Sequence, residues 1–183
     1  MAEQNEAQKE TQTGDKKFVK NVIRMRQQKR RTNKGERKES EFDQRIVDIR
    51  RVAKVNSGSK RLRMSVLVVI GDKKGRVGVG LGRGADVRSA TDKAVGKAKN
   101  NLIFVPLKDN TIPHEIDNKL GAAKILLKPA APGTGVIAGS AIRSVVELAG
   151  IKDILTKVIG TSNKIANVYC TIDAFKKLKS ARL

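Results

Sequence analysis

Residues 76–84 carry an alternation that few folds can accommodate. Val77, Val79 and Leu81 occupy every second position, and each position between them is glycine. Because successive side chains of a β-strand point to opposite faces, this segment predicts a strand with one apolar face and one face without side chains. A bare face of this kind allows close approach by another part of the chain or by a ligand.

The segments on either side of this alternation predict a hairpin and a helix. Residues 66–70 form a short run rich in β-branched residues, and a turn at 71–75 leads into the glycine-rich strand. Asp86 can then cap a helix that reaches about Asn101 and has apolar residues at helical spacing, namely Val87, Ala90, Ala94 and Ala98. Further upstream, residues 45–55 fit a bulged strand or a helix, because their periodicity does not distinguish the two.

The chain is predicted to have an α+β fold in three parts. Residues 1–40 lack hydrophobic periodicity and predict a disordered basic arm. Residues 41–107 contain strands in series followed by one helix with exposed basic residues, which resembles a double-stranded-RNA-binding domain. Residues 108–183 predict a second small mixed α/β domain with strands at 111–116, 123–128 and 154–159, a helix at 136–149 that ends at Gly150, and a last helix carrying Ile165, Val168, Ile172 and Phe175.

Net charge restricts the partners of the chain. It has 39 Lys and Arg residues against 18 Asp and Glu residues, a formal net charge of +21. Between Lys16 and Lys38, eleven basic residues accompany a single acid, Glu36. Phosphate backbones bind such surfaces with release of counterions, so a nucleic acid is the expected partner. Aromatic residues make up only 3% of the chain, which favours recognition of RNA shape and phosphates over stacking on single-stranded bases.

The same composition argues against several other classes of protein. The chain has no run of about 18 apolar residues, and residues 1–15 combine four acids with no apolar segment. We therefore expect no membrane insertion, secretion or organelle import. The expected location is the cytoplasm. Cys170 is the only cysteine and His114 the only histidine, so we interpret both as structural residues and expect no disulfide, metal site, cofactor, small-molecule substrate or catalytic residue.

Two glycine-containing motifs could bind phosphate groups. Gly80, Gly82 and Ala85 satisfy the G-x-G-x-x-A form of the dinucleotide fingerprint, with Asp109 at a suitable distance downstream. That fingerprint needs a parallel β-α-β unit, whereas the short turn before this strand predicts an antiparallel hairpin, so nucleotide binding is not favoured. The segment 133–135 before a predicted helix could present backbone amides to a phosphate, or could be a tight connection only.

The basic segment 54–63 is the strongest candidate for contact with nucleic acid. It has no acidic residue, and it contains four cations around a short polar turn, Lys54, Lys60, Arg61 and Arg63. We expect a mobile loop that contacts phosphates, with a solvated hairpin as the alternative. With other cations of the first domain, the candidate RNA-binding residues are Arg51, Lys54, Lys60, Arg61, Arg63, Arg76, Arg83 and Arg88.

Four strings in the chain are similar to a known family. They read RRVAKV, VVIGDKKGRVGVGLGRG, KAVGKAKNNLIFVPL and LLKPAAPGTGVIAGSAIRSVVELAGIKDILTK, and they lie within the segment from about Asp43 to Phe175. Taken together they resemble the bacterial-type ribosomal protein five of the small subunit. A collinear match of this length is more specific than any single motif.

The resemblance implies a structural protein of the small ribosomal subunit. Its partners would be small-subunit ribosomal RNA, messenger RNA where it enters the subunit, and ribosomal proteins four and eight, and it would support assembly and decoding accuracy. In that family the loop matching residues 54–64 reaches into ribosomal RNA and influences spectinomycin sensitivity. Positions matching Gly135 and Arg143 lie by the contact with protein four.

The chain departs from the family pattern in two places. Where the family loop reads VKGGR-x-FSF, this chain reads NSGSKRLRM, so Leu62 and Met64 replace two phenylalanines. Where the family reads NPxNVVRAT, this chain reads NKIANVYCT, which places Lys164 and Tyr169 at positions of proline and arginine.

Two other functions stay open from the residues alone. A free RNA-binding regulator or chaperone would show the same charge and the same basic arm. A nucleotide-dependent enzyme would rest on Gly80, Gly82 and Ala85.

Overall fold

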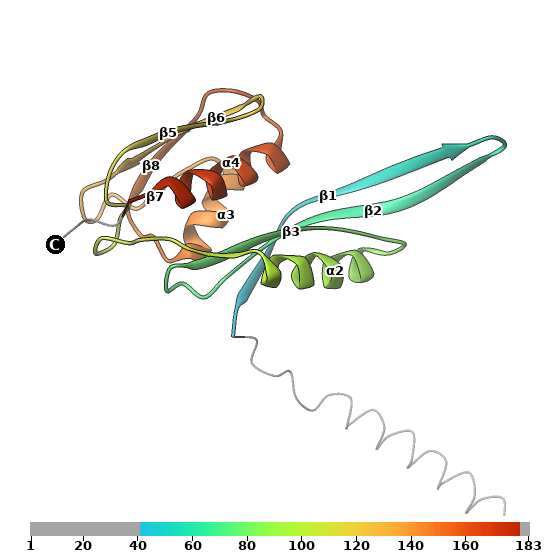
Figure 1. Ribbon diagram of the computed structural model, residues 1–183, viewed down its shortest axis with the longest axis horizontal. Helices are drawn as coiled ribbons and strands as arrows, with labels where there is room; N and C mark the ends of the chain where they lie inside the picture. The colour runs from blue at the N-terminus through green and yellow to red at the C-terminus, as the bar shows by residue number, and fades with distance from the viewer. Residues whose placement is uncertain (1–40, 180–183) are drawn as a thin grey trace, which may run out of the picture. The chain divides into compact units, whose positions relative to one another are not determined.

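The computed structural model describes residues 41–179, so the arm predicted at 1–40 lies outside the described residues (Figure 1). The described part of the chain contains, in order, β1 (Asp43–Asn56), β2 (Ser59–Gly71), β3 (Arg76–Gly84), α2 (Val87–Asn100), β4 (Leu102–Phe104), β5 (Ile116–Leu120), β6 (Ala123–Pro129), β7 (Val136–Ile137), α3 (Ser140–Ala149), β8 (Ile154–Val158) and α4 (Lys164–Lys177). The predicted α+β class is confirmed, because the strands form two separate sheets and the helices pack against them.

The first sheet is antiparallel, with strand order β1-β2-β3-β4, and α2 packs against one of its faces (Figure 1). Val66, Val68 and Ile70 of β2 are buried on this side, which we call the α2 face. The glycines of β3 lie against the same helix, and a Cβ atom on Gly80 would be 2.0 Å from the carbonyl oxygen of Ala94. The bare face that the alternation predicts is therefore occupied by the backbone of α2.

The opposite side of the first sheet, its inner face, packs against α3 and α4. The second sheet has the order β5-β6-β8-β7, in which β7 runs parallel to β8 and the other pairs are antiparallel. Leu67 and Val79 of the first sheet, Val145 of α3, Phe175 of α4 and Ile125 of the second sheet belong to one buried cluster. One apolar core therefore extends from the inner face of the first sheet, through the two helices, to the second sheet.

A β-bulge in β1 explains why its apolar pattern fits both a strand and a helix. The register with β2 shifts between Ile46 and Asp48. Arg45, before the shift, pairs with Val69, and Asp48, after it, pairs with Leu67, so both lie on the inner face. In a regular strand, residues an odd number of positions apart face opposite sides, so the bulge is what directs Asp48 toward α4.

Two predicted boundaries in the second half of the chain are wrong. The strand predicted at 111–116 begins only at its last residue, as β5, because Pro113 has no N–H group to donate to a neighbouring strand. The helix predicted from Val136 begins at Ser140, because Val136 and the next residue pair with β8 in extended conformation. Its predicted end is confirmed, since Gly150 adopts a left-handed conformation with φ of 91° at the C-cap.

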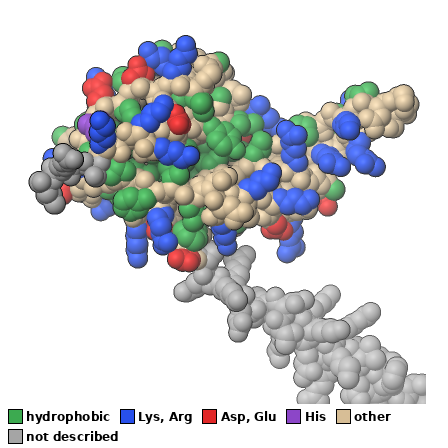
Figure 2. All heavy atoms as spheres, in the orientation of Figure 1, with side chains coloured by type: hydrophobic (Ala, Val, Ile, Leu, Met, Phe, Trp, Pro, Cys, Tyr) green, Lys and Arg blue, Asp and Glu red, His purple; other side chains and the backbone are tan. Residues whose placement is uncertain are grey.

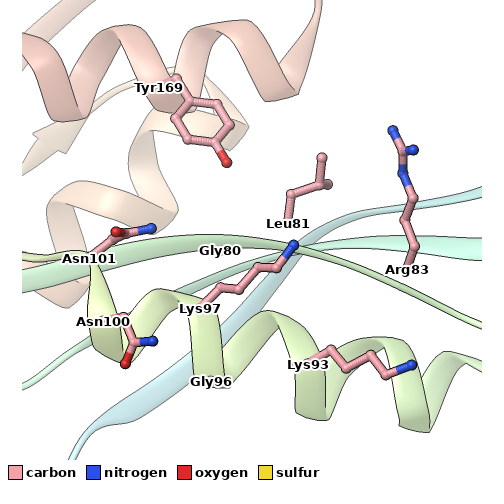
Figure 3. Close-up of a pocket in the computed structure, with 9 residues that line it drawn as sticks. All are labelled: Gly80, Leu81, Arg83, Lys93, Gly96, Lys97, Asn100, Asn101 and Tyr169. Atoms are coloured by element: carbon pink, nitrogen blue, oxygen red, sulfur yellow. The ribbon is translucent and has the colours of Figure 1, made fainter.

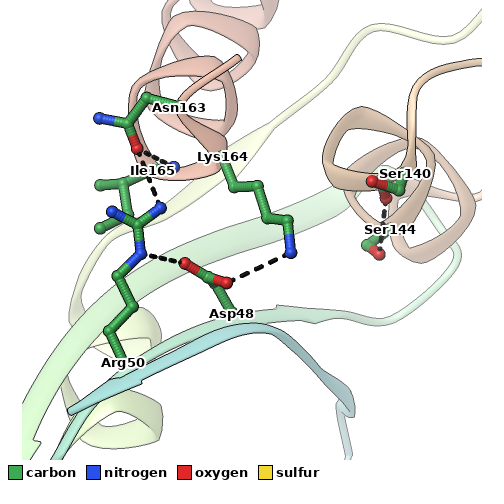
Figure 4. A network of polar contacts seen from close by, with 7 residues as sticks. All are labelled: Asp48, Arg50, Ser140, Ser144, Asn163, Lys164 and Ile165. Carbon is green, nitrogen blue, oxygen red and sulfur yellow. Dashed lines mark hydrogen bonds and ion pairs between the residues drawn. The ribbon is translucent and has the colours of Figure 1, made fainter.

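A polar network joins β1 to the start of α4 (Figure 4). The Asp48 carboxylate accepts a hydrogen bond of 2.5 Å from Arg50 Nε and one of 3.3 Å from Lys164 Nζ. Arg50 also donates to the side-chain oxygen of Asn163, which caps α4 by accepting from the backbone N–H of Ile165. Burial raises the pKa of Asp48, but hydrogen bonds and charge from Arg50 and Lys164 outweigh it, so the net pKa is lowered.

We predict that Asp48→Asn lowers the free energy of unfolding by about 1–2 kcal/mol at neutral pH, because it removes the charge that both cations contact. A carboxyl whose pKa is lowered by folding stabilises the fold fully above its unfolded pKa, and this contribution is lost as the pH falls through the folded pKa. Urea unfolding should therefore show a difference between wild type and variant that shrinks below about pH 4.

Asp43→Asn is the matched control for this prediction. Asp43 lies on the same strand as Asp48 and pairs with Lys73 of the turn between β2 and β3, but its side chain is 60% exposed, so its replacement should change stability by less than about 0.5 kcal/mol. Equal effects of the two substitutions, or a pH-independent effect at Asp48, would contradict the assignment of the network as a stabilising contact.

Candidate nucleic-acid interface

The basic segment 54–63 is the end of the β1–β2 hairpin, with a turn at Ser57 and Gly58. A paired hairpin takes the place of the expected mobile loop, because Lys54 pairs with Arg61 and Asn56 with Ser59 across the two strands. Contact of this segment with phosphates stays a prediction. The residues from 53 to 63 are all exposed. Figure 1 shows this end of the hairpin extending past the start of α2, and Figure 2 shows Lys and Arg side chains gathered along it.

Strand alternation sorts the hairpin cations onto two sides. Arg61 and Arg63 lie two residues apart on β2, Lys54 pairs with Arg61, and Arg83 pairs with Ser65 of β2. Residues that are paired or two apart share a side, so these cations all continue the inner face of the sheet beyond its apolar core. We call Lys54, Arg61, Arg63 and Arg83 the hairpin cluster.

The hairpin cluster surrounds a groove of about 430 Å³, whose other lining residues are Val52, Ala53 and Asn56. None of these lining residues is acidic. Within residues 41–179, no acid forms an ion pair with any cation of the cluster. Four cations without internal partners create a strongly positive surface, which fits an anionic polymer better than an apolar ligand.

The remaining candidate cations lie elsewhere on the first sheet and its helix. Lys60 and Arg51 pair with Val55 and Met64, which places them on the α2 face of the hairpin, and Arg88 is exposed in the first turn of α2. Cations are therefore available on both sides of the hairpin.

Arg76 is separated from this group. It begins β3 at the end of the sheet away from the hairpin turn, where it pairs with Asp72 at 2.6 Å and Glu41 at 3.3 Å. Its guanidinium also lies 5.2 Å from the centre of the Phe42 ring. Sequence reasoning grouped Arg76 with the others by charge, but the structure does not bring it into the hairpin cluster.

The glycine turn before β7 is held by the chain itself. The backbone N–H groups of Gly133 and Gly135 donate to one oxygen of the buried Asp153 carboxylate, at 3.1 and 2.8 Å. These amides are thus already satisfied and do not start a helix, so of the two readings the tight connection is correct. Arg143 of α3 donates to the carbonyl oxygen of Val136 at 3.0 Å, which places its side chain beside Gly135.

The structure gives no support to catalysis or nucleotide binding at the residues considered. The strand that carries Gly80 and Gly82, β3, pairs with both β2 and β4 in antiparallel orientation, so the β-α-β context of the dinucleotide fingerprint is missing. His114 is exposed in the segment before β5. Cys170 is fully buried in α4, near the carbonyl oxygens of Asn118 and Ala123, and burial raises the pKa of its thiol.

Residues 41–179 contain no cluster of three or more His, Cys, Asp and Glu side chains that could hold a metal ion. None of the described helices is both long enough and apolar enough to span a bilayer.

A second groove, of about 680 Å³, lies at the open edge of β3 (Figure 3). β4 pairs only with Arg76, Val77 and Gly78, so within residues 41–179 no strand pairs with β3 on this side from Val79 to Gly84. We call this the edge groove. Sequence reasoning missed it because Tyr169 of α4 lies far along the chain from the other lining residues, which come from β3 and α2.

Two family models match successive parts of the chain. The model described as "Ribosomal protein S5, N-terminal domain" matches residues 42–106, and that described as "Ribosomal protein S5, C-terminal domain" matches residues 118–182. The "Small ribosomal subunit protein uS5" of Thermus thermophilus is 49% identical over 142 residues, which cover 78% of this chain and 88% of that protein. The chain belongs to the ribosomal protein S5 family.

Other relatives of the ribosomal protein S5 family match to a similar extent. "Small ribosomal subunit protein uS5" of Picosynechococcus is 48% identical over 153 residues, 83% of this chain and 88% of the relative. "Small ribosomal subunit protein uS5c" of Rhodomonas salina is 45% identical over 153 residues, 83% of this chain and 91% of the relative. These matches confirm the family predicted from the four strings, and with it a structural ribosomal protein, not an enzyme.

Proposed function

We propose that this protein is a cytoplasmic, structural constituent of the small ribosomal subunit that binds ribosomal RNA through the β1–β2 hairpin. The hairpin cluster carries the proposal, because it gathers around one groove four cations that pair with no acid among residues 41–179. Membership of the ribosomal protein S5 family supplies the assembly in which such a surface would meet RNA.

The proposed mode of binding is contact with phosphates and recognition of RNA shape. Arg61 and Arg63 offer planar guanidinium groups that can each hold a phosphate with two hydrogen bonds, while lysines act as point charges. Because Arg51 and Lys60 lie on the α2 face, phosphates on either side of the hairpin can be bound. Regular strand pairing up to the turn fixes the backbone that carries these cations before RNA binds, which lowers the entropic cost of binding.

Four finer roles follow from the family resemblance and are part of the proposal. Gly135 and Arg143 would lie at a contact with ribosomal protein four and influence decoding accuracy, and their positions beside each other at β7 are compatible with one contact surface. The basic first domain would line the path by which messenger RNA enters the subunit. A contact with ribosomal protein eight and support of subunit assembly are also proposed.

Co-sedimentation with ribosomal subunits tests the proposed function. Tagged protein should migrate with the small subunit at physiological salt, in equal number with the subunit's other proteins, and should be largely absent from the fractions without ribosomes. A protein found mainly in those lighter fractions would instead be a free RNA-binding regulator, and the proposal would be abandoned.

A further inference from the structure

The edge groove has three walls from separate elements (Figure 3). Gly80, Leu81 and Arg83 of β3 form its floor. α2 forms one side, and Tyr169 of α4 forms the other, with its phenol ring extending from α4 toward β3. Helices on opposite faces of the sheet thus flank a stretch of strand edge that no other strand of the described part of the chain covers.

The charge of the edge groove favours an anionic ligand. Arg83, Lys93 and Lys97 line it, and no acidic residue does. None of these cations forms an ion pair with an acid among the residues that the structure describes. In Figure 3 the Lys97 side chain extends from α2 toward Leu81, so its ammonium group lies close to the strand edge.

The other side chains of the edge groove suit a nucleobase. Tyr169 is the only tyrosine of the chain and is 37% exposed, so part of its ring can accept a stacked base. The side-chain amides of Asn100 and Asn101, at the end of α2, can donate to and accept from a base edge.

Gly96 provides an independent indication that something approaches α2 here. A glycine in the middle of a helix costs about 1 kcal/mol relative to alanine. A Cβ atom on Gly96 would meet nothing within 4 Å, so the packing of the protein itself does not require glycine at this position. Because Gly96 lines the edge groove, the absence of a side chain keeps the groove open beside Lys93 and Lys97.

We infer that the edge groove binds an unpaired nucleotide segment of RNA, with a base against Tyr169 and phosphates on Lys93, Lys97 and Arg83. The inference deepens the proposed RNA-binding function and rests on it, but assigns single-stranded RNA to a second groove, which shares only Arg83 with the hairpin cluster. An acidic peptide that paired with the edge of β3 as an extra strand would also be attracted by these cations. It would also need pockets for alternate side chains, and the groove offers apolar contact only at Leu81 and Tyr169.

Binding of fluorescein-labelled hexauridine to the full-length protein, followed by fluorescence anisotropy, tests this inference. Tyr169→Ala should weaken binding about tenfold, the range expected for loss of one stacked base, whereas Tyr169→Phe keeps the ring and should bind within about twofold of wild type. Thermal unfolding of both variants checks that the fold is intact. If Tyr169→Ala, with an unchanged unfolding temperature, bound hexauridine as wild type does, the inference would be overturned.

Lys97→Gln and Lys99→Gln form a charge-matched pair on α2. Both lysines are exposed, but only Lys97 lines the edge groove, so Lys97→Gln should weaken hexauridine binding several-fold more than Lys99→Gln. Equal effects of the two substitutions would mean that bulk charge alone binds the oligonucleotide, and would contradict the inference. Displacement of bound hexauridine by a hexaglutamate peptide would instead assign the groove to peptides. Absence of hexauridine binding by a protein that still co-sediments with small subunits would remove this inference and leave the proposed function standing.

Discussion

Replacing Gly80 with alanine is expected to lower the free energy of unfolding by at least ~3 kcal/mol, because the new methyl group overlaps the backbone of α2. Its Cβ atom would lie 2.0 Å from the carbonyl oxygen of Ala94 and 2.7 Å from the backbone nitrogen of Ala98. Backbone atoms of a helix cannot rotate away as the end of a side chain can, so α2 would have to move off the sheet. Urea unfolding followed by circular dichroism measures the loss.

Gly96→Ala is the matched control, since it makes the same chemical change in α2 itself. No atom lies within 4 Å of the added carbon, so the variant should gain about 1 kcal/mol from the higher helix propensity of alanine. The two substitutions are thus expected to have opposite signs. A Gly80→Ala protein as stable as wild type would show that α2 does not pack on the glycine face.

Much of the first sheet could be predicted because its signals are local. The alternation at 76–84 predicts both the strand and its bare face, and the turn at 71–75 predicts the antiparallel pairing with β2. The partner of the bare face was less certain, since a ligand and a helix leave the same glycine pattern. Only the short distances from Gly80 to the backbone of α2 show that the helix fills it.

The errors arose where tertiary pairing overrides local pattern. Val136 belongs to an apolar stretch that continues as a helix, but pairing with Ile154 of β8 holds it extended. Asp153 reads in sequence as one of many scattered acids, yet it is buried and accepts two backbone hydrogen bonds from the 133–135 turn. No sequence periodicity encodes either contact, because the partners come from different elements.

The candidate site was predictable in composition but not in geometry. Charge alone identified Lys54, Arg61 and Arg63, but it could not separate them from Arg76, which is paired with acids at the other end of the sheet. The sequence marks Tyr169 as a departure from the family pattern but does not place it in a groove, because a single aromatic residue beside the apolar stripe of a helix resembles an ordinary core residue.

Neutralising the hairpin cations should weaken binding to transcribed small-subunit ribosomal RNA on the order of a hundredfold at physiological salt. The variant combines Lys54→Gln, Lys60→Gln, Arg61→Gln and Arg63→Gln. Each lost phosphate contact reduces the number of counterions that are released on binding. The slope of log affinity against log salt should therefore decrease in magnitude by about 3. Filter binding over a range of salt concentrations measures both quantities. The fold should be retained, because these side chains are exposed and lie outside the apolar core.

A control with four other lysines separates a specific surface from total charge. Lys108→Gln, Lys119→Gln, Lys152→Gln and Lys157→Gln remove the same number of charges from exposed positions outside the first sheet. If the hairpin is the RNA-binding surface, this control should lose far less affinity and keep most of the salt slope, since its lysines contribute only to the long-range field, which salt screens. Equal losses in both variants would show that RNA responds to net charge alone, and the hairpin would no longer be the proposed binding surface.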